Sequence, residues 1–279
     1  MSFTKMHGCG NCYIYFDCSD QTVPDPEALA IQLSEPHFGI GADGIILISP
    51  SDTADAQMRI FNADGSEGKM CGNGVRCVGK YLYDNGRTDG RTTVTVDTLS
   101  GIKTLELTVE DGKMRTARVD MGAAILAPRE IPVALEGDRA IGVPLVIDEK
   151  VYHITCVSMG NPHCVVFVEE DVGTLDLERI GPKFEHHPLF PERVNTEFVN
   201  VLPDGSLRMR VWERGSGETW ACGTGSCAVG VAACLTGRAH KDEDITIHLR
   251  GGDLTVRYTD QTVFMTGAAT TVCKGEIEI

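Results

Sequence analysis

Two cysteines of this 279-residue chain stand in the same glycine-rich setting, Cys71-Gly72-Asn73-Gly74 and Cys222-Gly223-Thr224-Gly225, and the step from position 71 to position 222 is 151 residues. A thiolate accepts a proton and a thiol donates one. Two cysteines on opposite sides of one carbon atom can therefore remove a proton from one face and return a proton to the other. The pattern predicts proton transfer at carbon by one thiol from each half of the chain.

A glycine-rich turn that opens into a helix is expected around each cysteine. The first N–H groups of a helix lack partners inside it, and the positive end of the helix dipole points the same way. We therefore expect each thiol pKa to be lowered towards neutrality. The same N–H groups bind anions, so a substrate carboxylate is expected there, with Gly72 and Gly223 allowing close approach. For one such motif a buried thiol in a tight turn is the simpler interpretation, but its recurrence favours catalysis.

Other segments repeat in the same order. Met58-Arg59-Ile60-Phe61 matches Met209-Arg210-Val211-Trp212, and Gly10-Asn11 precedes Gly160-Asn161 by 150 residues. This period is far longer than the roughly 20–50 residues of stacked repeats. The chain therefore reads as a tandem duplication of a domain-sized unit.

Hydrophobic patterning indicates what each unit contains. Helices are expected at Gly74–Tyr83 and Gly225–Leu235, and the second is apolar all round, as a buried helix is. Short runs with β character, separated by turn signals, predict strands. These runs are Tyr13–Phe16, Ile45–Ile48, Thr92–Val96, Thr104–Val109, Ala117–Asp120, Val151–Val157, Cys164–Val168, Glu197–Val201, Leu207–Val211, Ile245–Leu249, Leu254–Tyr258 and Val263–Thr266.

The predicted fold class is α+β, with two similar pseudo-symmetric domains. Each is expected to be a strongly curved, mainly antiparallel sheet wrapped around a central helix, with the active site in the cleft between them. Residues 1–120 would form the N-terminal half that carries Cys71, and residues 121–266 the C-terminal half that carries Cys222. The segment 267–279 is expected to complete the sheet of the first half.

Composition narrows the class of protein. A net charge of −15 argues against nucleic acid as a partner, and 42% hydrophobic residues are typical of a soluble globular protein. No apolar run approaches the ~20 residues that span a bilayer, and no signal peptide is evident, so no membrane association and a cytoplasmic location are expected. The eleven cysteines are odd in number and are expected to be free. The apolar surroundings of Cys156, Cys164, Cys234 and Cys273 predict core positions. Oligomeric state is not indicated, and a homodimer is left open.

A family resemblance covers essentially the whole chain. The matching segments are Lys5–Asn11, Gly39–Asp43, Ile60–Glu67, Cys71–Gly74, Ser158–Cys164, Pro191–Asn195, Glu213–Thr219 and Ala221–Gly225. On these segments the chain resembles the diaminopimelate epimerases. The resemblance implies an isomerase of lysine and peptidoglycan precursor biosynthesis that interconverts L,L- and meso-diaminopimelate, a small amino-acid substrate, without pyridoxal phosphate, another cofactor or a metal.

The resemblance also implies roles for individual residues. Cys71 and Cys222 would be the catalytic base and acid, and His163 and Glu213 would tune their pKa values. The substrate would be bound by Asn11, Asn62, Gly72, Asn73, Asn161, Asn195, Glu213, Arg214, Gly223 and Thr224. Independently of the family, the guanidinium of Arg214 suits a carboxylate and Glu213 suits an ammonium group.

Two positions depart from the family pattern and keep alternatives open. Position 12 is Cys where the family commonly has Asp, and position 44 is Gly where some members have Gln. Cys9 and Cys12 form a C-x-x-C motif, so a thiol-based metal or redox protein that uses Cys9, Cys12, Cys71 and Cys222 is the alternative from another class. No second C-x-x-C or histidine pair completes a zinc set, and an apolar β run follows the motif where a redox motif has a helix. Within the broader fold, a proline racemase-like enzyme, a C=C isomerase, or a relative acting on histidine or lanthionine also stays open.

Overall fold

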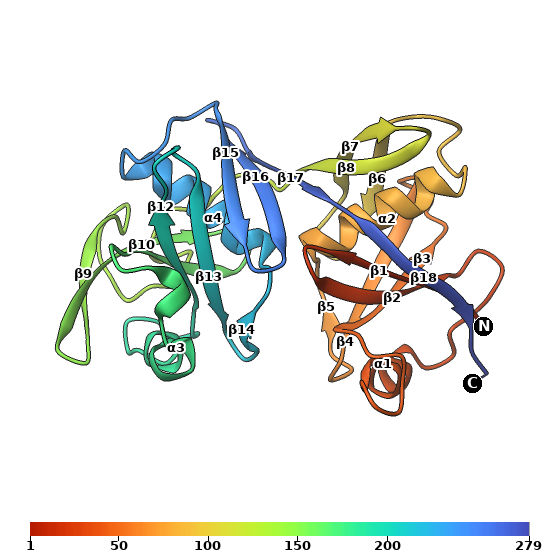
Figure 1. The fold of residues 1–279 in the computed structure, drawn as a ribbon, viewed down its shortest axis with the longest axis horizontal. Coiled ribbons are helices and arrows are strands. Elements are labelled where there is room, and N and C mark those ends of the chain that lie inside the picture. The colour runs from red at the N-terminus through yellow and green to blue at the C-terminus, as the bar shows by residue number, and fades with distance from the viewer. Residues whose placement is uncertain (279) are drawn as a thin grey trace. The chain divides into compact units, whose positions relative to one another are not determined.

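The chain forms two compact units in a computed structural model that describes residues 1–278. One unit contains Met1–Asp120 together with the chain from Thr266 onward, and the other contains Met121–Met265. In Figure 1 the first unit runs from red to yellow and includes the dark blue C-terminal strand, while the second runs from green to blue. Each unit has its own hydrophobic core.

The first unit contains two helices and nine strands that lie wholly within it, with these bounds: β1 Ser2–Gly8, β2 Asn11–Asp17, α1 Pro26–Ser34, β3 Gly44–Ser49, β4 Ala56–Asn62, β5 Glu67–Gly68, α2 Gly72–Asp84, β6 Thr93–Asp97, β7 Lys103–Glu110, β8 Lys113–Asp120 and β18 Thr270–Glu276. Strand β18 pairs with β1 in antiparallel register, with Cys273 opposite Lys5. The C-terminal segment therefore extends the sheet in which the chain begins.

The second unit repeats this arrangement with the following elements: β9 Val143–Ile147, β10 Lys150–Ser158, β11 Pro162–Phe167, the short 3-10 helix η1 Val172–Thr174, α3 Leu177–Glu185, β12 Asn195–Val201, β13 Leu207–Glu213, β14 Gly217–Thr219, α4 Gly223–Leu235, β15 Asp244–Leu249 and β16 Gly252–Tyr258. Strand β17, Val263–Ala268, crosses the boundary between the units.

Strand directions are the same in the two units. β1–β2 and β10–β11 are antiparallel, β2–β3 and β11–β12 are parallel, and β3–β4 and β12–β13 are antiparallel. The pairs β4–β6 and β13–β15 are again parallel. The parallel pairs were not predicted from the sequence. A parallel pair needs a long crossover connection. α1 lies in the connection of β2–β3, and α3 lies in that of β11–β12. In the same way, α2 connects β4 with β6, and α4 connects β13 with β15.

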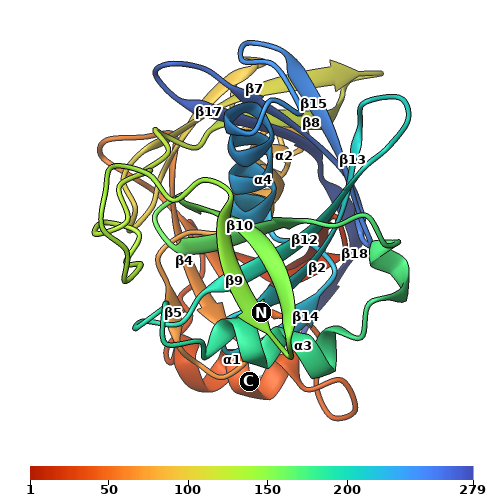
Figure 2. The ribbon, with the colours of Figure 1, turned by 90° about the vertical axis from the view of Figure 1, so that its left-hand side faces the viewer.

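Both predicted helices are confirmed, and each begins two residues earlier than expected. α2 and α4 have 13 residues each. α2 contacts β1, β2, β6, β7 and β8, and α4 contacts β10, β11, β12, β15 and β16, so each helix is packed by strands from several parts of its sheet. Figure 2 shows α4 running among the strands of its own unit. The twelve predicted strands are all present, with ends shifted by a few residues at most.

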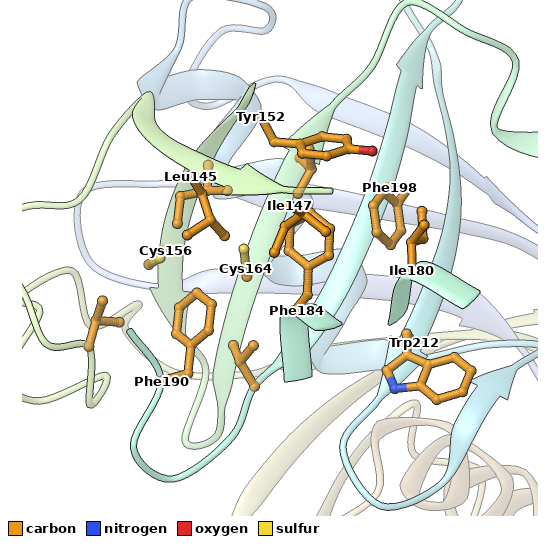
Figure 3. Packing of buried hydrophobic residues seen from close by; sticks show 14 of the residues in the cluster. Leu145, Ile147, Tyr152, Cys156, Cys164, Ile180, Phe184, Phe190, Phe198 and Trp212 are labelled. Carbon is orange, nitrogen blue, oxygen red and sulfur yellow. The ribbon is translucent and has the colours of Figure 1, made fainter. Parts of the chain in front are cut away.

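A second hydrophobic layer lies on the other side of each sheet. In the second unit, the ring of Phe184 on α3 packs edge-on against Tyr152 and Phe198, with 5.2 Å between ring centroids in each case (Figure 3). In the first unit, Leu29 and Leu33 of α1 join a corresponding core with β2, β3 and β4. Helices on both sides leave the central strands buried on both faces, which is where the cysteine-bearing helices gain their rigidity.

Four cysteines were predicted to lie in cores. Cys156 and Cys164 are buried, Cys234 is half-buried and Cys273 is exposed. The prediction was wrong for Cys273 because β18 is exposed along most of its length, so its short apolar run does not face a core. All eleven cysteines are free, and in residues 1–278 no helix combines the length and apolarity needed to cross a membrane.

Candidate active site

Cys71 is the N-cap residue of α2. Its backbone is extended, with φ −133° and ψ 118°, and its Sγ accepts a hydrogen bond from the Gly74 N–H at 3.3 Å. A sulfur in this position replaces the hydroxyl or carboxylate oxygen that usually caps a helix. The local sequence therefore places the thiol at the positive end of the helix, as predicted.

Asn11 is the nearest polar partner of this thiol. The Cys71 Sγ–H donates to Asn11 Oδ1 at 3.3 Å, and Asn73 Nδ2 donates to the same oxygen at 3.3 Å. Asn11 Nδ2 in turn donates to Asp43 Oδ2 at 2.8 Å. The structure thus brings together three residues predicted for the site, Cys71, Asn11 and Asn73, and adds Asp43.

The fully buried Arg76 closes this network on the other side. Its Nη2 donates to Asn73 Oδ1 at 3.0 Å, and its Nη1 donates to the Gly72 carbonyl at 3.2 Å. An arginine only donates and an ionised carboxylate only accepts. Because Arg76 stands at one end and Asp43 at the other, the amides of Asn73 and Asn11 have one consistent orientation, which presents Asn11 Oδ1 to Cys71.

Asn62 lies at the end of β4, in a turn of its own. Its Nδ2 donates to Ser66 Oγ at 3.1 Å, and its N–H donates to the Ser66 carbonyl at 2.9 Å. The side chain of Asn62 thus bonds to Ser66 and, within residues 1–278, not to the hydrogen-bond network around Cys71.

Cys222 caps α4 in the same way. Its backbone has φ −119° and ψ 111°, and its Sγ accepts from the Gly225 N–H at 3.4 Å. Thr224 Oγ1 lies 3.5 Å from the sulfur. Cys222 is only 6% exposed, whereas Cys71 is half-buried, so the two equivalent thiols have different access to solvent.

Two carboxyl groups, those of Glu213 and Glu197, lie near Cys222. The fully buried His163 places Nδ1 2.7 Å from Glu197 Oε1 and Nε2 3.0 Å from Asn161 Oδ1. Glu213 accepts a hydrogen bond from the Thr219 hydroxyl and another from the Cys222 thiol. The second unit therefore brings together Asn161, His163 and Glu213, three residues that the sequence analysis proposed for the site, and adds Glu197, which it did not propose.

The pKa of the Cys222 thiol is raised well above its ordinary value. Burial is the main cause, and the negative charges of Glu213 and Glu197 add to it. Hydrogen bonds from Thr224 and from the Gly225 N–H act in the opposite direction but are weaker. The expectation that the helix end would bring this pKa towards neutrality was wrong, because desolvation and two carboxylates outweigh the helix.

Glu213 is itself perturbed. Burial raises the pKa of its carboxyl, and nearby Glu197 acts in the same direction. The Thr219 hydrogen bond and the proximity of His163 lower it, without cancelling the effect of burial. A carboxyl that holds its proton more tightly than usual beside a thiol that does the same is a typical acid–base site.

Asn195 and Arg214 form a second group in this unit. Asn195 Nδ2 donates to the Pro162 carbonyl at 2.8 Å, and its Oδ1 accepts from the Arg214 N–H at 3.0 Å. Arg214 Nη1 donates to the Glu192 carbonyl at 3.0 Å. Asn195 is buried and fixes the backbone on which Glu213 and Arg214 stand.

Gly44, one of the two departures from the family pattern, has a structural reason. It pairs with Asn62 across β3–β4 and has φ +152°. A Cβ atom here would lie 2.1 Å from the Phe61 carbonyl oxygen, so a larger residue would require β4 to move.

Cys12 is the other departure from the family pattern. Burial raises the pKa of its thiol, and its backbone N–H donates to Asp43 Oδ2 at 2.8 Å. Within residues 1–278, no group of three or more His, Cys, Asp or Glu side chains is arranged to hold a metal ion.

Three residues of these networks were missed from the sequence, namely Asp43, Arg76 and Glu197. Asp43 belongs to a segment that carried the resemblance, but no role was assigned to it. Arg76 is a large cation between the apolar Val75 and Cys77, which was an available signal. For Glu197 the available signal was the internal repeat, because its counterpart 151 positions earlier is Ile46.

Comparisons with known proteins match most of the chain to one family. The family model described as diaminopimelate epimerase matches residues 3–127 and 155–272. A diaminopimelate epimerase of Agathobacter rectalis is 54% identical over 288 residues and covers 100% of both chains. One of Acetivibrio thermocellus is 53% identical and covers 100% of this chain and 99% of its own length. Among solved structures, a probable proline racemase of Agrobacterium radiobacter superposes with a TM-score of 0.74 at 17% identity, covering 100% of this chain and 93% of that chain. This last likeness shows a common mixed α/β fold.

Proposed function

The chain belongs to the diaminopimelate epimerase family, and from this premise we propose that Cys71 and Cys222 are the two acid–base groups of its reaction. The observation that carries the proposal is that each unit places one cysteine at the N-cap of a 13-residue helix, with a hydrogen bond to sulfur from the third N–H. One residue in thiolate form removes the α-proton of diaminopimelate. The other, in thiol form, donates a proton to the opposite face, so the stereocentre inverts and the two residues exchange protonation states.

The reacting carboxylate is assigned to the two helix ends. Removal of an α-proton leaves negative charge that spreads into the carboxylate, and N–H groups at a helix end stabilise it. Gly72 and Asn73 would supply these donors from α2, and Gly223 and Thr224 from α4. The amide of Asn73, held by Arg76, is already oriented for such a role.

The remaining family positions would hold the distal amino-acid end of the substrate. We assign Asn11, Asn62, Asn161 and Asn195 to its orientation, Glu213 to its ammonium group and Arg214 to its carboxylate. Glu213 and His163 are also assigned to tuning the thiols. The hydrogen bond from Cys222 to Glu213, and the proximity of His163 to Glu213, support this for Cys222.

The two units are proposed to be the pseudo-symmetric halves of the enzyme, residues 1–120 with 267–279 and residues 121–266. Each would be a strongly curved sheet around its cysteine-bearing helix. The identical strand order of the two units supports this. We also propose a cytoplasmic location, a compartment in which cysteines are kept reduced.

The test is incubation with L,L-diaminopimelate in D2O, with the stereoisomer ratio and α-deuterium followed for the wild type, Cys71→Ser and Cys222→Ser. We expect meso product carrying deuterium, and loss of inversion in both variants. Inversion that survives in either variant would overturn the two-thiol assignment. If the wild type leaves diaminopimelate unchanged and inverts histidine or lanthionine, the chemistry would stand and the substrate assignment would be wrong.

A further inference from the structure

We propose that Glu197 is a positioning residue of this site: its carboxyl group binds Nδ1 of His163 and fixes the orientation of the ring, and through His163 the side chain of Asn161. This inference rests on the proposed function, since it gives Asn161 a substrate to orient. It assigns a role to a residue that is not among the family positions considered above.

Glu197 is a buried carboxylate with a specific partner. Neither Glu197 nor His163 has any exposed surface, and Oε1 lies 2.7 Å from His163 Nδ1. Its other oxygen, Oε2, is buried without a hydrogen-bond partner among the described residues. Burying a carboxyl oxygen without a hydrogen-bond partner lowers the stability of the fold, so its presence here indicates a role other than stability.

The hydrogen-bond chemistry determines what Glu197 does. An amide oxygen only accepts, so Nε2 of His163 must carry the hydrogen that it donates to Asn161 Oδ1 at 3.0 Å. Nδ1, at the other side of the ring, then shares a hydrogen with Glu197 Oε1 at 2.7 Å. The histidine ring is held at both nitrogens, and the amide of Asn161, a proposed substrate contact, is held by the ring.

The duplication within the chain provides a comparison for this position. In the parallel pair β2–β3, Ile46 lies opposite Tyr15, and in β11–β12, Glu197 lies opposite Val165. These pairs are equivalent in the two units. Ile46 is fully buried and apolar, so the fold itself does not require a carboxylate here.

The same comparison holds on the helix side. A Cβ atom on Gly74 would lie 2.7 Å from Ile46 Cδ1, and one on Gly225 would lie 2.6 Å from Glu197 Oε1. Both side chains therefore press against the third residue of the cysteine-bearing helix. In the second unit this contact brings a carboxylate oxygen beside Cys222, whose Sγ would lie 3.2 Å from that Cβ atom. The raised pKa of Cys222 agrees with this placement.

The test compares Glu197→Ile, which installs the residue of the first unit, with Glu197→Gln, which keeps an acceptor and removes the charge. Ile46→Val is the matched control. The ring nitrogens of His163 are followed by long-range 1H–15N NMR, assigned with His163→Gln. In the wild type we expect a hydrogen on Nε2 and, at Nδ1, the 15N shift of a hydrogen-bonded nitrogen. Glu197→Gln can still bond Nδ1 and should keep this shift, whereas in Glu197→Ile the Nδ1 shift should move to that of an unbonded ring nitrogen.

Activity supplies the second measurement. We expect kcat/KM to fall in Glu197→Ile by about 10- to 100-fold, as when a carboxylate partner is removed from a metal-bound histidine, largely through a higher KM. Glu197→Gln should retain more activity, and Ile46→Val should match the wild type. An unchanged Nδ1 15N shift in a folded Glu197→Ile, or a kcat/KM within twofold of the wild type, would overturn the proposal. The NMR result is independent of catalysis, so an inactive wild type would refute the proposed function and leave the positioning role measurable.

Discussion

Oδ1 of Asn11 accepts hydrogen bonds from the Cys71 thiol and from Asn73 Nδ2, each at 3.3 Å. Both contacts depend on which end of the Asn11 amide faces the thiol. Asp43 determines this from outside the site, because its Oδ2 accepts from Asn11 Nδ2 at 2.8 Å. Asp43 should therefore matter for activity although it is exposed and does not contact Cys71.

We predict that Asp43→Ala lowers kcat/KM by about fivefold, the effect of losing roughly 1 kcal/mol of hydrogen bonding. Asp43→Asn should retain most of the activity, because its amide oxygen can still accept from Asn11. Steady-state kinetics in both directions provides the measurement. Equal activity of Asp43→Ala and the wild type would show that the Asn11 amide is held without Asp43.

The equivalent glycines Gly74 and Gly225 provide a matched pair of substitutions. In Gly74→Ala the new methyl group meets the end of the flexible Ile46 side chain, which can rotate away. In Gly225→Ala it meets Glu197, which is held by His163 at 2.7 Å, and the Cys222 side chain at 3.2 Å. We predict that Gly225→Ala destabilises the protein by about 1–3 kcal/mol, as overpacking does, and lowers kcat.

Gly74→Ala should change stability by less, since alanine also favours the helix. Urea denaturation followed by circular dichroism measures both variants, and the comparison is meaningful because the two glycines occupy the same place in the two units. Equal losses in Gly74→Ala and Gly225→Ala would contradict a special constraint at Glu197.

Much of the fold was predictable because its signals are local. The helices after Cys71 and Cys222 follow from glycine-rich capping segments and from apolar composition, and both are present. The helices α1 and α3 were missed, although Asp25 caps α1 and Pro26 begins it, because each has only nine residues of mixed polarity. Without these crossovers the parallel strand pairs could not be inferred.

The site was predictable where residues repeat and unpredictable where partners depend on strand register. Glu197 follows buried Thr196 and precedes buried Phe198 in β12. On a strand with one solvent-exposed face, a charged residue between two buried residues would point to water. Here Phe198 faces α3 and Glu197 faces α4, and only the parallel pairing with β11 places Glu197 beside His163.

A buried carboxylate also supports the turn that carries Arg214. Glu185 at the end of α3 accepts from the Trp212 indole at 2.7 Å and from the Gly215 N–H at 2.9 Å. We predict that Glu185→Ala lowers the free energy of unfolding by about 1–3 kcal/mol, because it leaves the indole N–H buried without a partner. KM should rise as well, since the turn on which Arg214 stands loses an anchor.

Glu192→Ala is the control for this substitution, because its side chain is exposed and its carbonyl, which accepts from Arg214, remains. Thermal unfolding and steady-state kinetics are measured on both variants. A Glu185→Ala protein as stable as Glu192→Ala would show that water or a rearranged side chain satisfies Trp212.

Cys222, one of the two cysteines proposed for catalysis, should react slowly with alkylating agents. The pKa of Cys222 is raised by burial and by the negative charges of Glu213 and Glu197, and only a thiolate is alkylated rapidly. Cys222 should therefore react slowly with iodoacetamide at pH 7 and faster as the pH rises. Removing a negative charge beside the thiol favours its ionisation, so Glu213→Gln should lower the pKa of Cys222 and speed alkylation at a given pH.

Peptide mapping by mass spectrometry follows Cys222 separately from the other cysteines, with buried Cys227 as the internal control for unfolding. Faster alkylation of Cys222 alone in Glu213→Gln would support an electrostatic effect, whereas parallel reaction of Cys227 would indicate loosening of α4.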